Sequence, residues 1–110
     1  MKTTDKVKQF LATCDLRRAN SVAVAEHLDI STSTLRRWLQ AEGTSFKKLL
    51  DEEREYRAYL RINLNPRILS KEIYDELGYA TPNSFCRAFK KHWGVDFQKY
   101  KIAIRARLLE

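Results

Sequence analysis

Residues 32–46 read "TSTLRRWLQAEGTSF" and place two adjacent arginines inside an apolar helical pattern. A similar stretch, "NSFCRAFKKHWGVDF", returns at residues 83–97. In the first stretch the apolar residues recur three and four positions after Leu35, which predicts a helix with one buried face. Arg36 and Arg37 lie about 100° and 200° around that helix from Leu35, so both should point away from the core. We therefore expect two helices that each carry a cationic outer face.

The 110-residue chain is basic, with 21 Lys and Arg against 14 Asp and Glu and a formal net charge of +7. In a small chain this excess favours an anionic partner, most often nucleic acid. Cys14 and Cys86 lack the spacing of a zinc site or a disulfide framework, so we expect no metal, no cofactor and a reducing cytosol. No apolar run approaches the roughly 18 residues that span a bilayer, and the first residues lack a signal-peptide core.

Glycine and proline are scarce and β-branched residues do not alternate, so the sequence predicts an all-α fold. Apolar spacing predicts a first helix with Thr4 or Asp5 near its N-cap and a short second helix capped by Ser21. Only "DIS" separates the second helix from a third at 32–41, for which Ser31 or Thr32 is the expected cap. Two helices joined by so short a turn predict a helix-turn-helix.

Residues 45–64 contain no helix breaker and predict one long helix. At about 1.5 Å per residue its length approaches the roughly 34 Å between successive major-groove faces of DNA. Beyond it, Ser70 is the expected cap of a helix reaching Leu77, and Pro82 suits the first turn of a helix at 82–93.

The two halves align as a tandem duplication, with Leu28 against Leu77, Leu35 against Phe85, Arg37 against Arg87 and Leu39 against Phe89. We expect about seven helices in two tandem helix-turn-helix subdomains, at 5–44 and 65–104. The long helix at 45–64 joins them, and residues 105–110 form a tail. Aromatic residues with aliphatic neighbours at helical spacing are expected in the core: Trp38, Tyr56, Tyr59, Trp93 and Tyr100.

The stretch "LGYATPNSFCRAFKKHWGVDFQKYK" at residues 77–101 combines a Gly-aromatic pair, a polar turn, an aromatic-x-Arg-x-Phe-Lys-Lys run and a later Gly and Tyr. Here, and at "ISTSTLRRWLQAEGTSFKKLLDEEREYRA" in the first half, the chain resembles the DNA-binding domain of AraC/XylS-type transcriptional regulators. The resemblance extends from about Lys6 to Lys101. It implies a sequence-specific regulator with recognition helices at about 32–41 and 82–93 in successive major grooves of double-stranded DNA.

The resemblance also implies which side chains meet DNA. Those expected at base edges are Ser33, Arg36, Arg37, Pro82, Asn83, Cys86 and Arg87. Those expected at phosphates are Thr32, Thr34, Ser84, Lys90 and Lys91. Arginine can donate two hydrogen bonds to guanine and asparagine can pair with adenine, whereas Pro82 has no such donor. Gln40 and Ala41 depart from a pair that is commonly basic in the family.

Further implications concern compartment and partners. Membership would place the chain in the bacterial cytoplasm, associated with the nucleoid, with RNA polymerase as a further partner. An effector-binding or dimerisation domain often accompanies this module, and we assign none of the residues to one. Acid gathers in "DEERE" at 51–55, while residues 86–107 hold seven Lys and Arg against Asp96 alone. This segregation suits phosphate on one side and another protein on the other.

Three other classes of function remain alternatives. An enzyme would need a nucleophile and base, paired carboxylates or a phosphate-binding glycine loop, and the sequence has none at a recognisable spacing, so we expect no enzyme. An RNA-binding module fits the charge, but it lacks the sheet aromatics or GXXG loop of the usual single-strand readers. A protein–protein adaptor that kept the fold but lost DNA contacts is favoured by Gln40 and Ala41 and disfavoured by the arginines.

Overall fold

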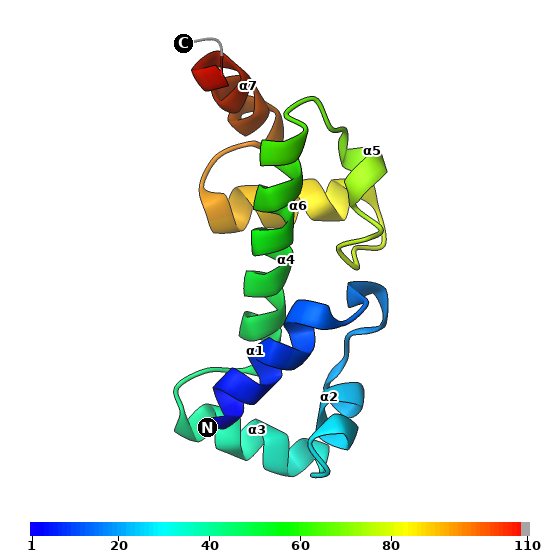
Figure 1. The fold of residues 1–110 in the computed structure, drawn as a ribbon, viewed down its shortest axis with the longest axis vertical. Helices are drawn as coiled ribbons and strands as arrows, with labels where there is room; N and C mark the ends of the chain where they lie inside the picture. The colour runs from blue at the N-terminus through cyan, green and yellow to red at the C-terminus, as the bar shows by residue number, and fades with distance from the viewer. Residues whose placement is uncertain (109–110) are drawn as a thin grey trace. The chain divides into compact units, whose positions relative to one another are not determined.

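The computed structural model describes residues 1–108 (Figure 1). Its helices in chain order are α1 (Thr3–Thr13), α2 (Ser21–His27), α3 (Thr32–Ala41), α4 (Phe46–Leu64), α5 (Ser70–Ile73), α6 (Pro82–Trp93) and α7 (Phe97–Leu108), and a short 3-10 turn spans Leu16–Arg18. No β-strand occurs among the described residues, and the expected all-α class is confirmed. Helices α3 and α6 have the bounds expected for the two recognition helices.

Helix α4 contributes to two separate cores. The chain divides into two compact units, Met1–Arg54 (unit 1) and Glu55–Glu110 (unit 2), and the division falls inside this helix. Leu49 is buried in the core of unit 1, whereas Ile62 is buried in the core of unit 2. The helix that we expected as a linker at 45–64 is therefore also a packing element of each unit.

Unit 1 is built on a core drawn from α1, α2, α3, the first turns of α4 and the 3-10 turn. Its buried members are Val7, Leu11, Leu16, Val24, Ala25, Leu35, Leu39, Leu49 and Leu50. Burying a leucine-sized side chain is worth roughly 1.5–3 kcal/mol relative to exposing it, so this set drives the folding of unit 1. Leu16 belongs to the 3-10 turn, which helical spacing did not predict.

Helices α2 and α3 begin at residues whose side chains satisfy free backbone N–H groups. Asn20 Oδ1 accepts a hydrogen bond from Ala23 N at 2.8 Å and caps α2, so the expected cap at Ser21 is wrong by one residue. Ser31 Oγ accepts from Thr34 N at 3.0 Å and caps α3, as expected. Both helices of the helix-turn-helix pair therefore start at side-chain caps.

The start of α1 is capped from a distant part of the chain. Lys2 is its N-cap residue and supplies no side-chain hydrogen bond, and Thr4 and Asp5 lie in the first turn, near the N-cap as expected. Instead, Thr4 N donates to Glu42 Oε1 at 2.9 Å, and Thr3 N donates to Glu42 Oε2 at 3.2 Å. The hydrogen bonds from Thr4, and then those from Thr3, lower the pKa of Glu42. The residue that follows α3 thus ties the start of α1 to the end of α3.

The core of unit 2 is richer in aromatic rings. Phe85 and Phe89 of α6 meet Phe97 of α7 edge to face, with ring centroids 5.0 and 5.5 Å apart. Such pairs add stabilisation beyond the apolar area that they bury. The other buried apolar members are Ala58, Ile62, Ile68, Ile73, Leu77 and Ile104.

Two helices of unit 2 differ from their expected extents. Helix α5 ends at Ile73, followed by turns at residues 74–78, and its N-cap residue is Leu69 instead of Ser70. Helix α7 continues to Leu108 instead of giving way to a tail at residue 105. The last two residues of that expected tail lie outside the described part of the chain.

Two cations of α7 hold the loop that precedes α5. Lys101 is 2% exposed, donates from Nζ to the carbonyl of Ile68 at 2.6 Å, and lies 4.6 Å from the centroid of the Phe97 ring. Burial lowers the pKa of Lys101, because the charged ammonium loses contact with water. Arg105 Nη1 donates to the carbonyl of Pro66 at 3.3 Å. These two cations therefore serve the fold of unit 2.

Three aromatic residues expected in the core are exposed. Trp38 is 47% exposed, Tyr56 57% and Tyr59 39%, so their assignment to the core is wrong. Each keeps helical spacing with aliphatic neighbours, but spacing does not determine how wide the buried stripe of a helix is. Trp93 and Tyr100 pack, half-buried, against the core of unit 2.

Replacing Leu35 by Asp tests the register of α3. Leu35 is 1% exposed, and burying a carboxylate there should lower the free energy of unfolding of unit 1 by at least about 3 kcal/mol. Trp38→Asp on the same helix is the matched control, and we expect it to cost less than about 1 kcal/mol because Trp38 faces solvent. Thermal melts followed by circular dichroism compare the two variants. A normal melt for Leu35→Asp would contradict the register.

The hydrogen bonds that the Glu42 carboxylate accepts predict that the folding stability of unit 1 depends on pH. Because the pKa of Glu42 in the folded chain lies below its ordinary value of 4.5, its stabilising contribution is complete above about that pH. It is lost as the pH falls through the folded-state pKa. We expect wild type to melt at a higher temperature than Glu42→Gln at pH 7, with the difference shrinking as the pH is lowered below 4.5. Glu26→Gln, at an exposed position of α2, should show no such difference.

Candidate nucleic-acid interface

Helix α3 separates a buried face from an outward face that carries the first group of expected site residues. Leu35 and Leu39 are each 1% exposed and anchor the helix in unit 1. About 160–200° around the helix from Leu35 lie Ser33 and Arg37, and both are exposed. The outward face is therefore fixed by where the two leucines are buried. Thr32, Arg36 and Gln40 are exposed beside it.

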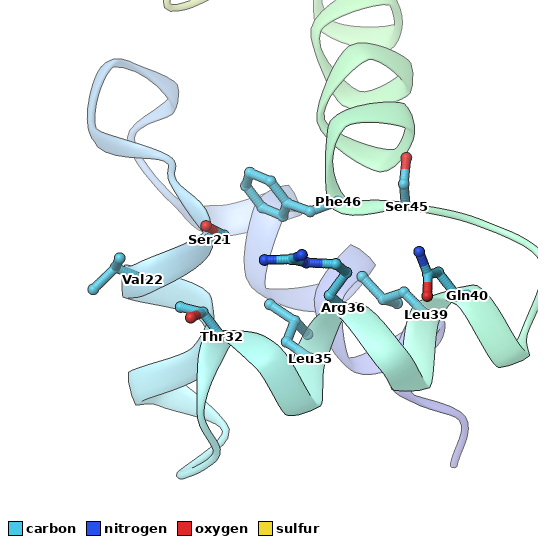
Figure 2. A pocket seen from close by; sticks show the side chains of 9 residues that line it. All are labelled: Ser21, Val22, Thr32, Leu35, Arg36, Leu39, Gln40, Ser45 and Phe46. Carbon is cyan, nitrogen blue, oxygen red and sulfur yellow. The ribbon is translucent and has the colours of Figure 1, made fainter.

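The two adjacent arginines have different surroundings. Arg37 Nη2 donates to Thr34 Oγ1 at 3.4 Å, and Thr34 Oγ1 also accepts from Ser31 Oγ at 2.9 Å. Half-buried Thr34 therefore supports Arg37 from the first turn of α3. The side chain of Arg36 has no hydrogen bond or ion pair with any residue that the structure describes. In Figure 2 its side chain extends from α3 and lies between Leu35 and Phe46 in the view.

Arg36 lines a groove that the sequence did not predict (Figure 2). The groove lies between α2, α3 and the start of α4 within unit 1, and its volume is about 460 Å³. Its lining consists of Ser21, Val22, Thr32, Leu35, Arg36, Leu39, Gln40, Ser45 and Phe46. Three separate segments contribute to it, so spacing along a single helix could not reveal it. Thr32 and Gln40, four residues before and after Arg36, are members that helical spacing alone could have placed beside that arginine.

Helix α6 carries the second group of expected site residues and has a well-defined start. Ser84 N donates to Thr81 Oγ1 at 3.0 Å and Thr81 N donates to Ser84 Oγ at 3.2 Å, which is a reciprocal capping box. Pro82 occupies the first turn, where its missing N–H costs nothing. At the other end, Gly94 has a φ of +71° and closes the helix in the left-handed region.

The outward face of α6 repeats the arrangement of α3. Phe85 and Phe89 are each 2% exposed and anchor it in unit 2. The expected site residues that are exposed on α6 are Asn83, Arg87, Lys90 and Lys91. The remaining expected site residues of this helix, Pro82, Ser84 and Cys86, are half-buried. Cys86 packs against the core of unit 2, so part of its surface is covered by protein.

Contacts with α4 fix the end of α6 inside unit 2. The rings of Tyr59 and Trp93 stack at an interplanar angle of 9°, with centroids 5.8 Å apart. His92 Nδ1 lies 2.9 Å from Glu55 Oε1. Both contacts join the last turn of α6 to the second half of α4, so the outward face of α6 is held by more than its two phenylalanines.

The charges are less segregated than expected. Of the basic residues between 86 and 107, Lys101 and Arg105 bind backbone carbonyls, which leaves as exposed cations Arg87, Lys90, Lys91, Lys99 and Arg107. Within the acidic stretch at 51–55, Asp51 lies 3.3 Å from Lys47 Nζ, and Glu55 faces His92. Part of the acid therefore contacts basic side chains inside the units. Among residues 1–108, no His, Cys, Asp and Glu side chains cluster as a metal site would require. The helices of this described part are also too short or too polar for any of them to cross a bilayer.

Comparisons with known proteins agree with this geometry. A family model described as a helix-turn-helix domain matches residues 24–102. The uncharacterized HTH-type transcriptional regulator Rv1395 of Mycobacterium tuberculosis is 39% identical over 77 residues, which are 70% of this chain and 22% of the relative. The HTH-type transcriptional activator CsvR of Escherichia coli is 30% identical over 97 residues, 88% of this chain and 36% of the relative. The chain thus spans well under half the length of these relatives.

Solved structures show the same fold. The transcriptional regulator CdpR of Pseudomonas aeruginosa superposes with a TM-score of 0.82 at 29% identity, covering 90% of this chain and 31% of that one. The C-terminal domain of the response regulator AraT of Geobacillus stearothermophilus superposes with a TM-score of 0.79 at 28% identity, covering 94% and 86%. With its two capped, outward-facing recognition helices, the chain belongs to the AraC-type family of helix-turn-helix, DNA-binding transcriptional regulators.

Proposed function

We propose that this chain binds a specific site on double-stranded DNA, with α3 and α6 each in a major groove and the two grooves successive. The observation that carries the proposal is the same on both helices: a buried apolar face is paired with an exposed polar face, which carries Ser and Arg on α3 and Asn and Arg on α6. The major groove distinguishes all four base pairs by hydrogen-bond donors and acceptors, and these are the side chains that read them. One chain carries both helices, so a single copy suffices for the site.

We assign base reading to the exposed members of the expected set: Ser33, Arg36, Arg37, Asn83 and Arg87. Arg37 has the strongest support, because Thr34 holds its guanidinium without neutralising it. Thr32, Lys90 and Lys91 are exposed and suit phosphate contacts, which set the position of a protein on the duplex without reading its sequence. Asn83 is suited to adenine and Arg87 to guanine.

The half-buried members of the expected set suit other roles. Thr34 and Ser84 use their hydroxyls in hydrogen bonds at the starts of α3 and α6, so each positions its helix. Pro82 and Cys86 can offer only an apolar edge to a base, for example to a thymine methyl group. We therefore expect fewer base contacts by hydrogen bonds from α6 than from α3.

We extend the proposal to the setting of the whole protein. CsvR and CfaD of Escherichia coli are named as HTH-type transcriptional activators, and an activator must influence the transcription machinery. On this basis we propose a non-enzymatic regulator that acts on the bacterial nucleoid in the cytoplasm, with RNA polymerase as a further partner. Exposed Glu52 and Tyr56 on α4 are available for such a protein contact.

Replacing a base-reading residue and replacing a phosphate-contacting residue should both lower the affinity for DNA. The two losses of affinity should differ in how they depend on the DNA sequence and on the salt concentration. Arg37→Ala should cost about 1–3 kcal/mol on the preferred site and relax preference at one or two base pairs, with little loss on scrambled DNA. Lys90→Ala should weaken both duplexes by a similar factor and flatten the slope of log affinity against log salt by about one unit. Titrations of both duplexes across a salt series measure these effects.

Arg37→Lys is the matched control for the arginine variant. It keeps the positive charge but loses the planar fork that makes two parallel hydrogen bonds, so specificity should fall while binding to scrambled DNA is retained. Circular dichroism establishes that helicity is unchanged in each variant. Equal losses on both duplexes for Arg37→Ala would reduce this arginine to a general phosphate contact and end its assignment as a reader.

The stoichiometry and footprint test the two-groove proposal. We expect one chain to protect a non-palindromic site of about two helical turns, with two major-groove segments contacted. Hydroxyl-radical footprinting of a selected site and native mass spectrometry of the complex measure both quantities. Protection of one groove segment only, or two chains on a palindrome, would contradict the proposal.

A further inference from the structure

The groove beside α3 is built differently from the rest of the outward face. Its floor is formed by Leu35 and Leu39, each 1% exposed, and its walls include half-buried Phe46 and Val22, which is 54% exposed. Small polar side chains line its remaining edge: Ser21, Thr32, Gln40 and Ser45. Arg36 is the one charged residue of the lining. An apolar interior with few polar groups at its edge is the usual make-up of a small-molecule site.

The size and charge of the groove limit what can fill it. Its volume of about 460 Å³ lies within the range of small-ligand sites. A DNA duplex is a stiff, convex rod and can place only an edge in such a hollow. Arg36 pairs with none of the described residues, and no carboxylate lies in the lining to neutralise it. A guanidinium with free donors binds a carboxylate through two parallel hydrogen bonds.

We propose that this groove binds a small amphipathic carboxylate. Its apolar body lies on Leu35 and Leu39, and Arg36 binds its carboxylate. Arg36 is also assigned to DNA reading, so the bound molecule competes with DNA. The competition rests on the proposed function, whereas the binding of the carboxylate does not.

Titration of the whole ¹⁵N-labelled chain with 2-naphthoate tests the site directly. Its rigid ring system matches an apolar floor, and we expect a Kd on the order of 1 mM, with amide shifts confined to α2, α3 and the start of α4. The neutral analogue 2-naphthamide should bind about tenfold more weakly, because it cannot pair with Arg36 as an ion. Acetate, which lacks the apolar body, should cause no shifts at the same concentration. Equal binding of naphthamide, shifts scattered over α6 and α7, or no shifts with naphthoate would overturn the proposal.

Two variants and one matched control locate the site. Arg36→Gln should weaken 2-naphthoate at least about tenfold, since a charge-assisted pair is lost. Arg37→Gln removes the same charge one residue away, outside the groove, and should change the Kd less than about twofold. Val22→Trp fills the groove from an exposed position and should abolish binding while circular dichroism stays unchanged. Equal weakening by both arginine variants would show a diffuse charge effect and overturn the site.

Competition is measured separately on a selected DNA site. At a 2-naphthoate concentration nine times its Kd, the apparent Kd for DNA should rise about tenfold. Ligand shifts in the groove without any change in DNA affinity would overturn the competition and leave the ligand site supported. Loss of DNA affinity in Val22→Trp, with no 2-naphthoate binding to wild type, would show that the groove serves the DNA backbone and overturn the proposal. Failure of wild type to bind DNA would refute the proposed function alone, because the titration without DNA still decides the ligand site.

Discussion

The structure depends on one constraint that is applied twice: a recognition helix must bury two large apolar side chains four residues apart. Leu35 and Leu39 do this on α3, and Phe85 and Phe89 do it on α6. A helix anchored at two points on one side cannot rotate about its axis without exposing them, at a cost of about 1.5–3 kcal/mol for each side chain. The polar residues between and around the anchors are thereby held outward. The chemistry of the outward face is therefore a consequence of core packing, because the anchors set the direction in which every other side chain of the helix points.

The two units meet this constraint by different means. Unit 1 uses aliphatic side chains and closes α1 onto the end of α3 through Glu42, whose carboxylate satisfies two backbone N–H groups. Unit 2 uses stacked and edge-on aromatic rings, and it buries the ammonium of Lys101 against a carbonyl and the face of Phe97. A buried ammonium loses hydration, so its hydrogen bond at 2.6 Å must compensate for that loss. Duplication of a sequence pattern has thus preserved the anchors and the outward face, while the remainder of each core is stabilised by its own contacts.

Sequence reasoning predicted the helix class, the bounds of α3 and α6 and the outward position of the arginines, because these follow from periodicity and from breakers such as Gly94. It misplaced Trp38, since the width of a buried stripe depends on which neighbouring helices cover it and not on spacing within the helix. It also counted Lys101 and Arg105 as surface cations, because sequence cannot show that a loop passes within reach of their side chains. The groove was missed for a related reason: its walls come from three segments that are brought together only by the packing of unit 1.

Arg36 and Arg37 show why neighbours in a recognition helix need not act alike. A step of one residue turns the side chain by about 100°, so Arg37 lies opposite the leucine anchors while Arg36 lies at the border between the outward face and the core. Arg37 is exposed, and Thr34 holds its guanidinium. Arg36 is also exposed, but it lies beside an apolar hollow lined by three segments of unit 1. Arg36 is stabilised by any anion that also covers the hollow, whereas Arg37 is stabilised only by a hydrogen-bond acceptor that approaches the outward face. The two neighbouring arginines therefore lie in different environments. The buried leucines fix the rotation of the helix about its axis, and the difference arises from the direction in which each arginine side chain leaves that helix.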